Sequence, residues 1–132
     1  MSSDKFCLKW NNFESTLSCA FKDIREEKEL FDVTIACEDE QLQAHRLILS
    51  ACSPFFKTVF YRNKHEHPLL YLKGISAKDM EAVLNFIYNG EVNVAQDDLN
   101  SFLQVAEDLR VKGEHLLCLT NILTLLCRTH TE

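Results

Sequence analysis

Glycine and proline are scarce in this sequence: three glycines and two prolines occur in 132 residues. Each one is therefore informative as a break, and we expect helices and strands joined by short turns. No two glycines lie near each other, which excludes the glycine-rich loop that cradles phosphates. The Gly-x-Ser-x-Gly elbow of serine hydrolases is also absent. The scarcity of glycine thus argues against nucleotide-binding and α/β-hydrolase chemistry.

An excess of basic residues is also missing. The 14 Lys and Arg are outnumbered by 20 Asp and Glu, which gives a net charge of −6. Binding to a nucleic acid backbone relies on a basic face, so we expect no direct contact with nucleic acid. The longest apolar run, residues 116–126, is interrupted by polar side chains and is shorter than the ~20 residues that cross a bilayer. We therefore expect no membrane partner.

Close cysteine pairs are absent, although six cysteines are present. Most of them lie on apolar faces, where a free cysteine behaves as a small hydrophobic residue. The first residues, Met-Ser-Ser-Asp, lack the basic and then apolar pattern of a signal peptide. We predict free thiols and a reducing compartment, the cytosol or the nucleus.

Histidine and cysteine offer the only candidates for a metal site or a nucleophile. His65 and His67 share one loop, and His115 and Cys118 are spaced as neighbours on a helix, with Cys127 and His130 further on. A structural zinc site needs closely paired ligands on a tight scaffold, and no such pairing occurs here. No acid, base and nucleophile converge in the pattern. We interpret these residues as core cysteines and surface histidines, and predict no metal, no cofactor and no enzyme activity.

The hydrophobic periodicity predicts short strands placed among about six helices, an α+β class with one core in a single domain over residues 1–132. The apolar positions alternate in the predicted strands and recur at helical spacing in the predicted helices. Ser53 and Ser76 are each expected to cap a helix, and Gly90 to end one. Strands are predicted at residues 6–10, 31–37, 41–44, 69–72 and 91–94. Helices are predicted to include residues 17–24, 47–52, 54–60, 77–87, 97–109 and 115–127.

The first strand and the first helix present surplus apolar surface. Phe6, Leu8 and Trp10 lie on one side of a strand that has no hairpin partner, because a helix follows it. Such a strand pairs readily with another chain, and exchange between two copies is one way to do so. Addition to the chain's own sheet is the alternative, and the residues alone leave both open. The first helix carries one apolar stripe, formed by Leu17, Ala20, Phe21 and Ile24.

Charged residues meet at the mouth of the predicted hairpin. Asp32 opens its first strand, and His45 and Arg46 follow its second strand. A partly buried carboxylate and guanidinium must be paired, so we favour a structural ion pair between Asp32 and Arg46. We expect His45 to be buried and hydrogen-bonded.

Three segments in this order carry a family resemblance: Phe31–Thr34, Ala44–Phe56 and Phe86–Val92. They hold a strand, a His-Arg pair, an apolar helix, a Ser-x-x-Phe helix start and a Tyr-x-Gly segment. Together they resemble the BTB/POZ domain family over about residues 6–127. The opening residues 6–12 and the later residues 109–113 are similar to the Tramtrack-type group of insect BTB domains.

The resemblance implies a BTB/POZ fold, in which a helical cluster is flanked by a small mixed sheet and the N-terminal strand is exchanged between chains. By this resemblance Phe6, Leu8 and Trp10 belong to the exchanged strand. The stripe Leu17, Ala20, Phe21 and Ile24 then contributes to the dimer or multimer interface. Asp32, His45 and Arg46 fall at the charged-pocket positions, near the proposed groove for a corepressor.

The resemblance also implies a function and partners. Tramtrack-type domains are modules of nuclear transcription or chromatin regulators, so we expect a nuclear oligomerisation domain that pairs with itself, with related BTB proteins and with corepressor or chromatin factors. A substrate adaptor for a Cullin-3 ubiquitin ligase is the alternative. Such adaptors carry an apolar-x-Glu motif in the loop after the Ser-Pro-Phe-Phe helix, and Lys64 stands at the apolar position here.

The resemblance divides the chain into three parts. Residues 1–12 would form the exchange strand, residues 13–113 the BTB core, and residues 114–132 an extra C-terminal helix and tail. The last part departs from the Tramtrack-type pattern, because a polar linker usually follows the Lys112-Gly113 pair in that group. Here an apolar segment continues instead.

Overall fold

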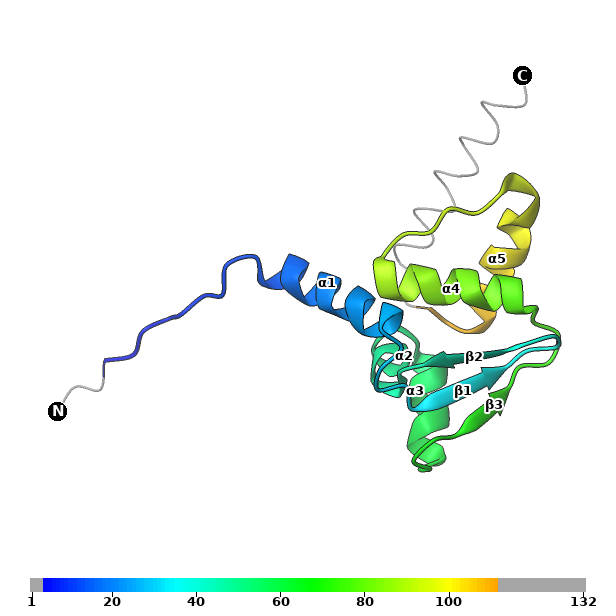
Figure 1. The fold of residues 1–132 in the computed structure, drawn as a ribbon, viewed down its shortest axis with the longest axis horizontal. Coiled ribbons are helices and arrows are strands. Elements are labelled where there is room, and N and C mark those ends of the chain that lie inside the picture. Colours follow the sequence, from blue (N-terminus) through cyan, green and yellow to red (C-terminus); the bar gives the residue numbers. More distant parts are fainter. Residues whose placement is uncertain (1–3, 112–132) are drawn as a thin grey trace, which may run out of the picture.

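A computed structural model describes residues 4–111 of the chain (Figure 1). Within that range the chain forms five helices and three strands, an α+β arrangement as predicted. In chain order the elements are α1 (Phe13–Glu26), β1 (Val33–Ala36), β2 (Gln41–Ala44), α2 (Arg46–Cys52), α3 (Pro54–Arg62), β3 (Leu69–Tyr71), α4 (Ala77–Asn89) and α5 (Gln96–Asp108).

The three strands form one small mixed sheet in the order β2-β1-β3. β1 and β2 are the predicted hairpin, antiparallel with Val33 opposite Ala44. β3 returns parallel to β1 and places Leu70 opposite Ile35. Val33 and Ile35 are completely buried, because alternate side chains of a strand point to the same face of the sheet. The central strand therefore anchors the core.

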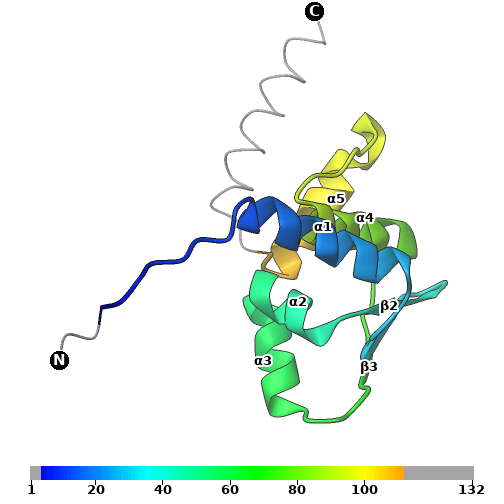
Figure 2. The ribbon, with the colours of Figure 1, turned by 60° about the vertical axis from the view of Figure 1, so that its left-hand side comes forward.

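Helices pack against this sheet and enclose one hydrophobic core. α4 contacts β2 and α2, and it lies between α5 and the sheet (Figure 1). α2 and α3 pack against each other near the end of the hairpin (Figure 2). The core draws its largest fully buried side chains from the sheet and from three helices: Val33, Ile35, Leu49, Phe56, Met80, Val83 and Leu84.

The predicted helix boundaries are confirmed at three positions. The Ser53 hydroxyl accepts a hydrogen bond from the Phe56 amide at 3.2 Å, and the Ser76 hydroxyl accepts one from the Asp79 amide at 3.2 Å. Both serines satisfy a backbone donor that has no partner inside its helix. Gly90 ends α4 with φ 79°, a left-handed conformation that glycine adopts without strain.

Two predicted strands are not present in the described part of the chain. Residues 6–10 and residues 91–94 have no secondary structure, although apolar residues alternate with others along both segments of the sequence. A strand needs a hydrogen-bonded neighbour as well as an alternating pattern, and these segments have no such neighbour among the described residues. α5 begins at Gln96 and ends at Asp108, one residue before Leu109, the last apolar position of the predicted helix. The predicted apolar helix at 115–127 lies outside the described residues.

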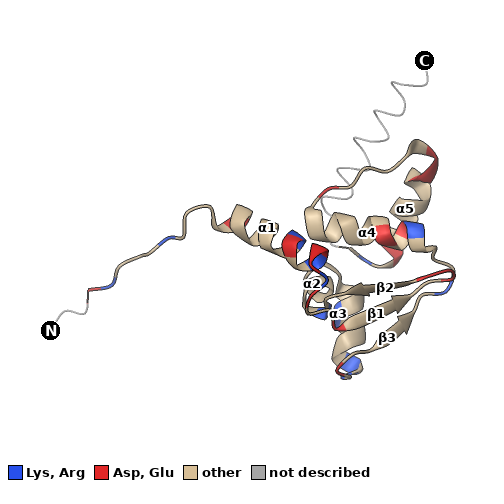
Figure 3. Cartoon of the chain, viewed as in Figure 1, with Lys and Arg blue, Asp and Glu red and all other residues tan. Residues whose placement is uncertain are grey.

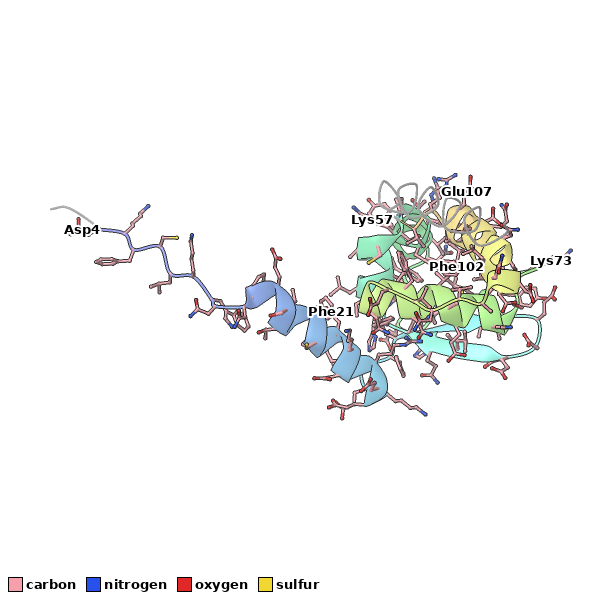
Figure 4. The ribbon with its side chains drawn as sticks, turned by 90° about the horizontal axis from the view of Figure 1, so that it is seen from above. Asp4, Phe21, Lys57, Lys73, Phe102 and Glu107 are labelled. Atoms are coloured by element: carbon pink, nitrogen blue, oxygen red, sulfur yellow. The ribbon has the colours of Figure 1, made fainter. Side chains whose placement is uncertain are left out.

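The N-terminal part of the chain projects from the body. Residues 4–12 run away from the core (Figures 1 and 2), and the start of α1 also lies outside the body (Figure 1). α1 reaches the body through its packing on α4. Seen from above, Asp4 lies at the far tip and Phe21 lies where α1 approaches the core (Figure 4). The surfaces implicated by the sequence therefore lie at the edge of the molecule.

Candidate self-association surface and charged pocket

The N-terminal segment exposes the three apolar side chains that the sequence analysis places in a strand. Phe6 is 84% exposed, Leu8 91% and Trp10 63%. Residues 4–10 form no ladder with the chain's own sheet. Contiguous exposed apolar surface of this kind usually marks an interaction site. Of the two alternatives left open by the sequence, addition to the chain's own sheet is not the arrangement in the structure.

A turn at Asn12 joins this segment to α1. Asn12 has φ 60°, a left-handed conformation that asparagine tolerates better than most residues. The Ser15 hydroxyl donates a hydrogen bond to the Asn12 carbonyl at 3.1 Å. The rings of Trp10 and Phe13 lie 5.3 Å apart across the turn. Aromatic surface therefore continues from the segment onto the start of α1.

The apolar stripe of α1 is only partly used inside the chain. Ala20, Phe21 and Ile24 are half-buried, and Phe21 packs against the core cluster. Leu17 is 38% exposed, and Phe13 is 47% exposed. No residue of α1 is fully buried. The predicted stripe thus divides into a C-terminal half that holds α1 to the body and an N-terminal half that is open.

Asp32 and Arg46 form the ion pair that the sequence analysis favours. The Arg46 Nε donates to Asp32 Oδ2 at 3.0 Å, and the Arg46 amide donates to Asp32 Oδ1 at 2.7 Å. The Arg46 Nη1 donates to the His65 carbonyl at 2.6 Å. Both side chains are partly exposed, so the pair contributes modestly to stability. Its contacts join the start of β1, the start of α2 and the loop before β3.

His45 is buried, as predicted, and both ring nitrogens are used. Its Nε2 lies 2.7 Å from the Glu29 carbonyl, which only accepts, so Nε2 carries the proton. The Tyr88 hydroxyl therefore donates to the neutral Nδ1 at 2.6 Å. The same oxygen accepts from the His45 amide at 3.0 Å. His45 faces inward and links three parts of the fold, whereas Asp32 and Arg46 face the surface.

Arg25 completes this buried network on the other side of Tyr88. Its guanidinium carbon lies 5.0 Å from the centre of the Tyr88 ring, a cation–π distance, and its Nη1 donates to Asn85 Oδ1. Burial lowers the pKa of Arg25, opposed by Tyr88 and by Glu81. Burial also raises the pKa of Tyr88 to about 12, opposed by the His45 amide and the Arg25 charge. The phenol is therefore protonated at neutral pH.

The sequence analysis did not identify Arg25, Asn85 or Tyr88 as partners. The spacing of Glu81, Asn85 and Tyr88 at i, i+4 and i+7 was the available signal, because it places them on one face of α4. Helical spacing shows which residues share a face but does not show which element that face meets.

No metal centre is evident in the described residues. Across residues 4–111, no three His, Cys, Asp or Glu side chains gather closely enough to bind an ion. His67 Nε2 is hydrogen-bonded to Thr34 Oγ1 at 2.9 Å. Cys37 is a buried thiol whose pKa is raised by burial and by Asp39 and Glu40, which disfavours the reactive thiolate. In the view of Figure 3, Lys and Arg are scattered among Asp and Glu.

The helices of the described residues lack the features of a membrane span. None of those in residues 4–111 has both the length and the apolar character that a bilayer crossing needs.

The fold and the surfaces agree with a single protein family. A match to the BTB/POZ domain covers residues 21–125. The chain belongs to the BTB/POZ domain family. The structure is similar to the BTB domain of zebrafish PATZ1, with a TM-score of 0.76 and 21% identity, over 91% of this chain and 99% of that one. BTB/POZ domains are protein-interaction domains, which agrees with the prediction that the chain is not an enzyme.

Curated relatives from Drosophila melanogaster confirm the Tramtrack-type placement of this BTB/POZ domain. The chain is 46% identical to the alpha isoform of tramtrack over 113 residues, and 48% identical to the sex determination protein fruitless over 109 residues. These matches cover 86% and 83% of this chain, but only 14% and 11% of the relatives. The longitudinals lacking protein-like chain is 47% identical over 114 residues, which cover 86% of this chain and 90% of that relative.

Proposed function

We propose that this BTB/POZ domain associates with a second copy of itself by exchanging residues 4–12. The observation that carries the proposal is the exposure of Phe6, Leu8 and Trp10 on a segment that contacts no sheet of its own chain. An apolar segment in this state lowers its free energy by packing on another molecule. Pairing as a strand would also satisfy its backbone donors and acceptors.

A second segment offers a place for the exchanged strand. Residues 91–94 connect α4 to α5 and form no ladder within the described chain. Val92 and Val94 are half-buried, whereas Glu91 and Asn93 are exposed, so one side is already packed as in a strand. The chain therefore has two segments with strand-like patterns and no strand partner. If residues 4–12 of one copy paired with residues 91–94 of the other, each segment would gain a hydrogen-bonded strand partner.

α1 extends the same surface. Phe13 and Leu17 are exposed beside the N-terminal segment, at 47% and 38%, and the Phe13 ring contacts the Trp10 ring of that segment. An interface made of the segment and this helix face would be apolar, and folding and association are coupled in apolar interfaces that are also large. We therefore expect a stable dimer, from which larger assemblies form.

The wider role follows from the family placement and is part of the same proposal. Tramtrack and fruitless extend far beyond the region that they share with this chain, and in a protein of that kind the domain would act as one module. Longitudinals lacking protein-like is matched over 90% of its length, so the domain could also make up most of a protein. We infer a role in the nucleus, in transcription or chromatin regulation, with related BTB proteins and corepressor or chromatin factors as partners. Of the predicted charged-pocket residues, Asp32 and Arg46 at the surface would contribute to partner recruitment near the dimer interface, and buried His45 would support them from inside the fold.

Light scattering combined with size exclusion tests the association directly. Phe6, Leu8 and Trp10 are replaced together by serine, which removes the apolar side of the segment and keeps its length. The matched control replaces Lys5, Cys7 and Lys9, which alternate with them, by serine. We expect a dimer or larger assembly for the wild type and the control, and loss of that assembly for the first variant. A monomeric wild type would defeat the proposal.

A Cullin-3 adaptor role remains the second candidate, and exposed apolar residues on β3 favour it. Leu69 is 62% exposed and Tyr71 is 61% exposed at the edge of the sheet. Lys64 stands at the apolar position of the adaptor motif, and its Nζ lies 5.4 Å from the centre of the Tyr61 ring. Binding of purified Cullin-3 to the wild type, lost in a Leu69→Asp variant, would support this role.

A further inference from the structure

α1 is held to the body by little apolar contact. It has no fully buried residue, and only Ala20, Phe21 and Ile24 of its apolar stripe are half-buried. Its N-terminal part extends beyond the body (Figure 1). A helix held by one short patch can pivot about that patch unless further contacts determine its angle. The angle matters, because α1 carries Phe13 and Leu17 toward any second copy.

Polar contacts fix the C-terminal end of α1 to a single buried ring. Arg25 lies over one face of Tyr88 and also donates to Asn85. The Tyr88 hydroxyl donates to His45 Nδ1 and accepts from the His45 amide. His45 in turn donates from Nε2 to the Glu29 carbonyl, just beyond α1. Tyr88 is thus contacted at its ring face and at its hydroxyl. The first contact comes from Arg25 in α1, and the second connects through His45 to Glu29, just beyond α1.

The link between α1 and β1 is strained at two positions. Lys28 has φ 58° and Leu30 has φ 61°, left-handed conformations that disfavour side chains larger than glycine. Such strain persists where surrounding contacts over-determine the backbone. The Glu29 carbonyl that receives the His45 hydrogen bond lies between the two strained residues. This bond therefore holds the link in one conformation.

We propose that Arg25, Tyr88 and His45 form one positioning unit that sets the angle of α1 and thereby the surface offered to a second copy. The inference rests on the proposed self-association and adds the residues that control it from inside the fold. Tyr88 is 3% exposed and His45 is 7% exposed, so neither reaches a second copy. Their effect on association must pass through α1.

The test uses Tyr88→Phe, which keeps the ring under Arg25 and removes both hydrogen bonds to His45. The matched control is Tyr71→Phe at an exposed tyrosine. Sedimentation equilibrium measures the dimer dissociation constant, and hydrogen exchange compares residues 13–31 with β1 and α3. We expect Tyr88→Phe to raise the dissociation constant about tenfold, which corresponds to about 1.4 kcal/mol. We also expect faster exchange in residues 13–31 than in β1 and α3, and no effect of Tyr71→Phe.

The outcomes separate this inference from the proposed function. A monomeric wild type defeats the self-association itself. Unchanged association of Tyr88→Phe overturns the positioning unit alone, and so does faster exchange spread evenly over the whole core. Should Tyr88→Phe fail to fold, Arg25→Gln replaces it, with Arg62→Gln on the exposed end of α3 as control. Equal dissociation constants for these two variants would likewise overturn the inference.

Discussion

Single buried polar groups in this domain are satisfied by partners from distant parts of the chain. Within residues 4–111, no buried side-chain nitrogen or oxygen lacks a hydrogen bond. The Ser53 hydroxyl both caps α3 and donates to the Leu109 carbonyl at the end of α5. Both ring nitrogens of His45 are hydrogen-bonded, one to the Tyr88 hydroxyl and the other to the Glu29 carbonyl. Because an unsatisfied buried group costs about 1–3 kcal/mol, these side chains specify how the elements meet.

We predict that a single buried residue, Tyr88, makes the stability of the domain sensitive to alkaline pH. The pKa of Tyr88 is raised to about 12 in the folded chain, against about 10 for an unfolded tyrosine. The folded state binds this proton more tightly, so the associated stability is complete below about pH 10 and is lost as pH rises toward 12. The free energy of unfolding in urea, measured from about pH 9 to pH 11, should fall more steeply for the wild type than for Tyr88→Phe.

Tyr71→Phe serves as the control for this titration, because Tyr71 is exposed. It should retain the steep fall of the wild type. Parallel pH profiles for the wild type and Tyr88→Phe would contradict the assignment of the alkaline sensitivity to Tyr88.

Among the elements, α1 combines two roles on one apolar stripe. Phe21 packs on the core, and Leu17 lies one turn earlier at a position that is 38% exposed. Helical periodicity places both on one face, because they are four residues apart. The two positions differ because α4 packs against the C-terminal half of α1. Phe21 therefore makes a contact inside the chain, whereas Leu17 is left partly exposed.

We predict different effects for the same substitution at these two positions. Phe21→Asp places a charge against the core and should lower the free energy of unfolding by roughly 2–4 kcal/mol. Leu17→Asp should change it by less than about 1 kcal/mol in the single chain, and should abolish self-association. Urea unfolding and light scattering measure the two effects. Ser18→Asp adds the same charge at an exposed position of α1 and should alter neither.

The outcome of interest at Leu17 is the oligomeric state. A Leu17→Asp variant that elutes and scatters like the wild type would show that this part of α1 is not covered by a second copy.

The described chain, residues 4–111, consists of a packed body and a projecting arm, residues 4–19. The core cluster lies in residues 33–111, whereas residues 4–19 carry no buried residue. The arm therefore contributes little to the stability of the single chain but supplies most of the apolar surface proposed for association. Folding and association should be coupled through it.

We predict that the melting temperature depends on protein concentration. For a coupled dimer, a tenfold rise in concentration should raise Tm by roughly 3–5 °C in a domain of this size. The variant with serine at Phe6, Leu8 and Trp10 should melt at a lower temperature that does not change with concentration. Scanning calorimetry over a hundredfold range of protein concentration distinguishes the wild type from the variant, because the Tm of a coupled dimer should rise by about 4 °C for each tenfold step. A concentration-independent wild type would argue against obligate pairing.

The local features of this fold were predictable from the sequence because their causes lie within a few residues along the chain. The caps at Ser53 and Ser76, the turn at Gly90 and the β1–β2 hairpin depend on neighbouring backbone groups and on alternation. The ion pair between Asp32 and Arg46 was also predictable, because a short hairpin brings its two ends together. The family resemblance rests on the same local segments.

Contacts between distant segments were decided only by the tertiary structure. Alternation predicted strands at residues 6–10 and 91–94, but a strand exists only with a hydrogen-bonded partner, and neither segment has one within residues 4–111. The burial of His45 was predictable, whereas its partner Tyr88 lies 43 residues away and required α4 to be in place. The sequence by itself determined which segments are apolar, capped or alternating. The tertiary structure decided which of those surfaces are covered, because burial depends on what packs against a segment.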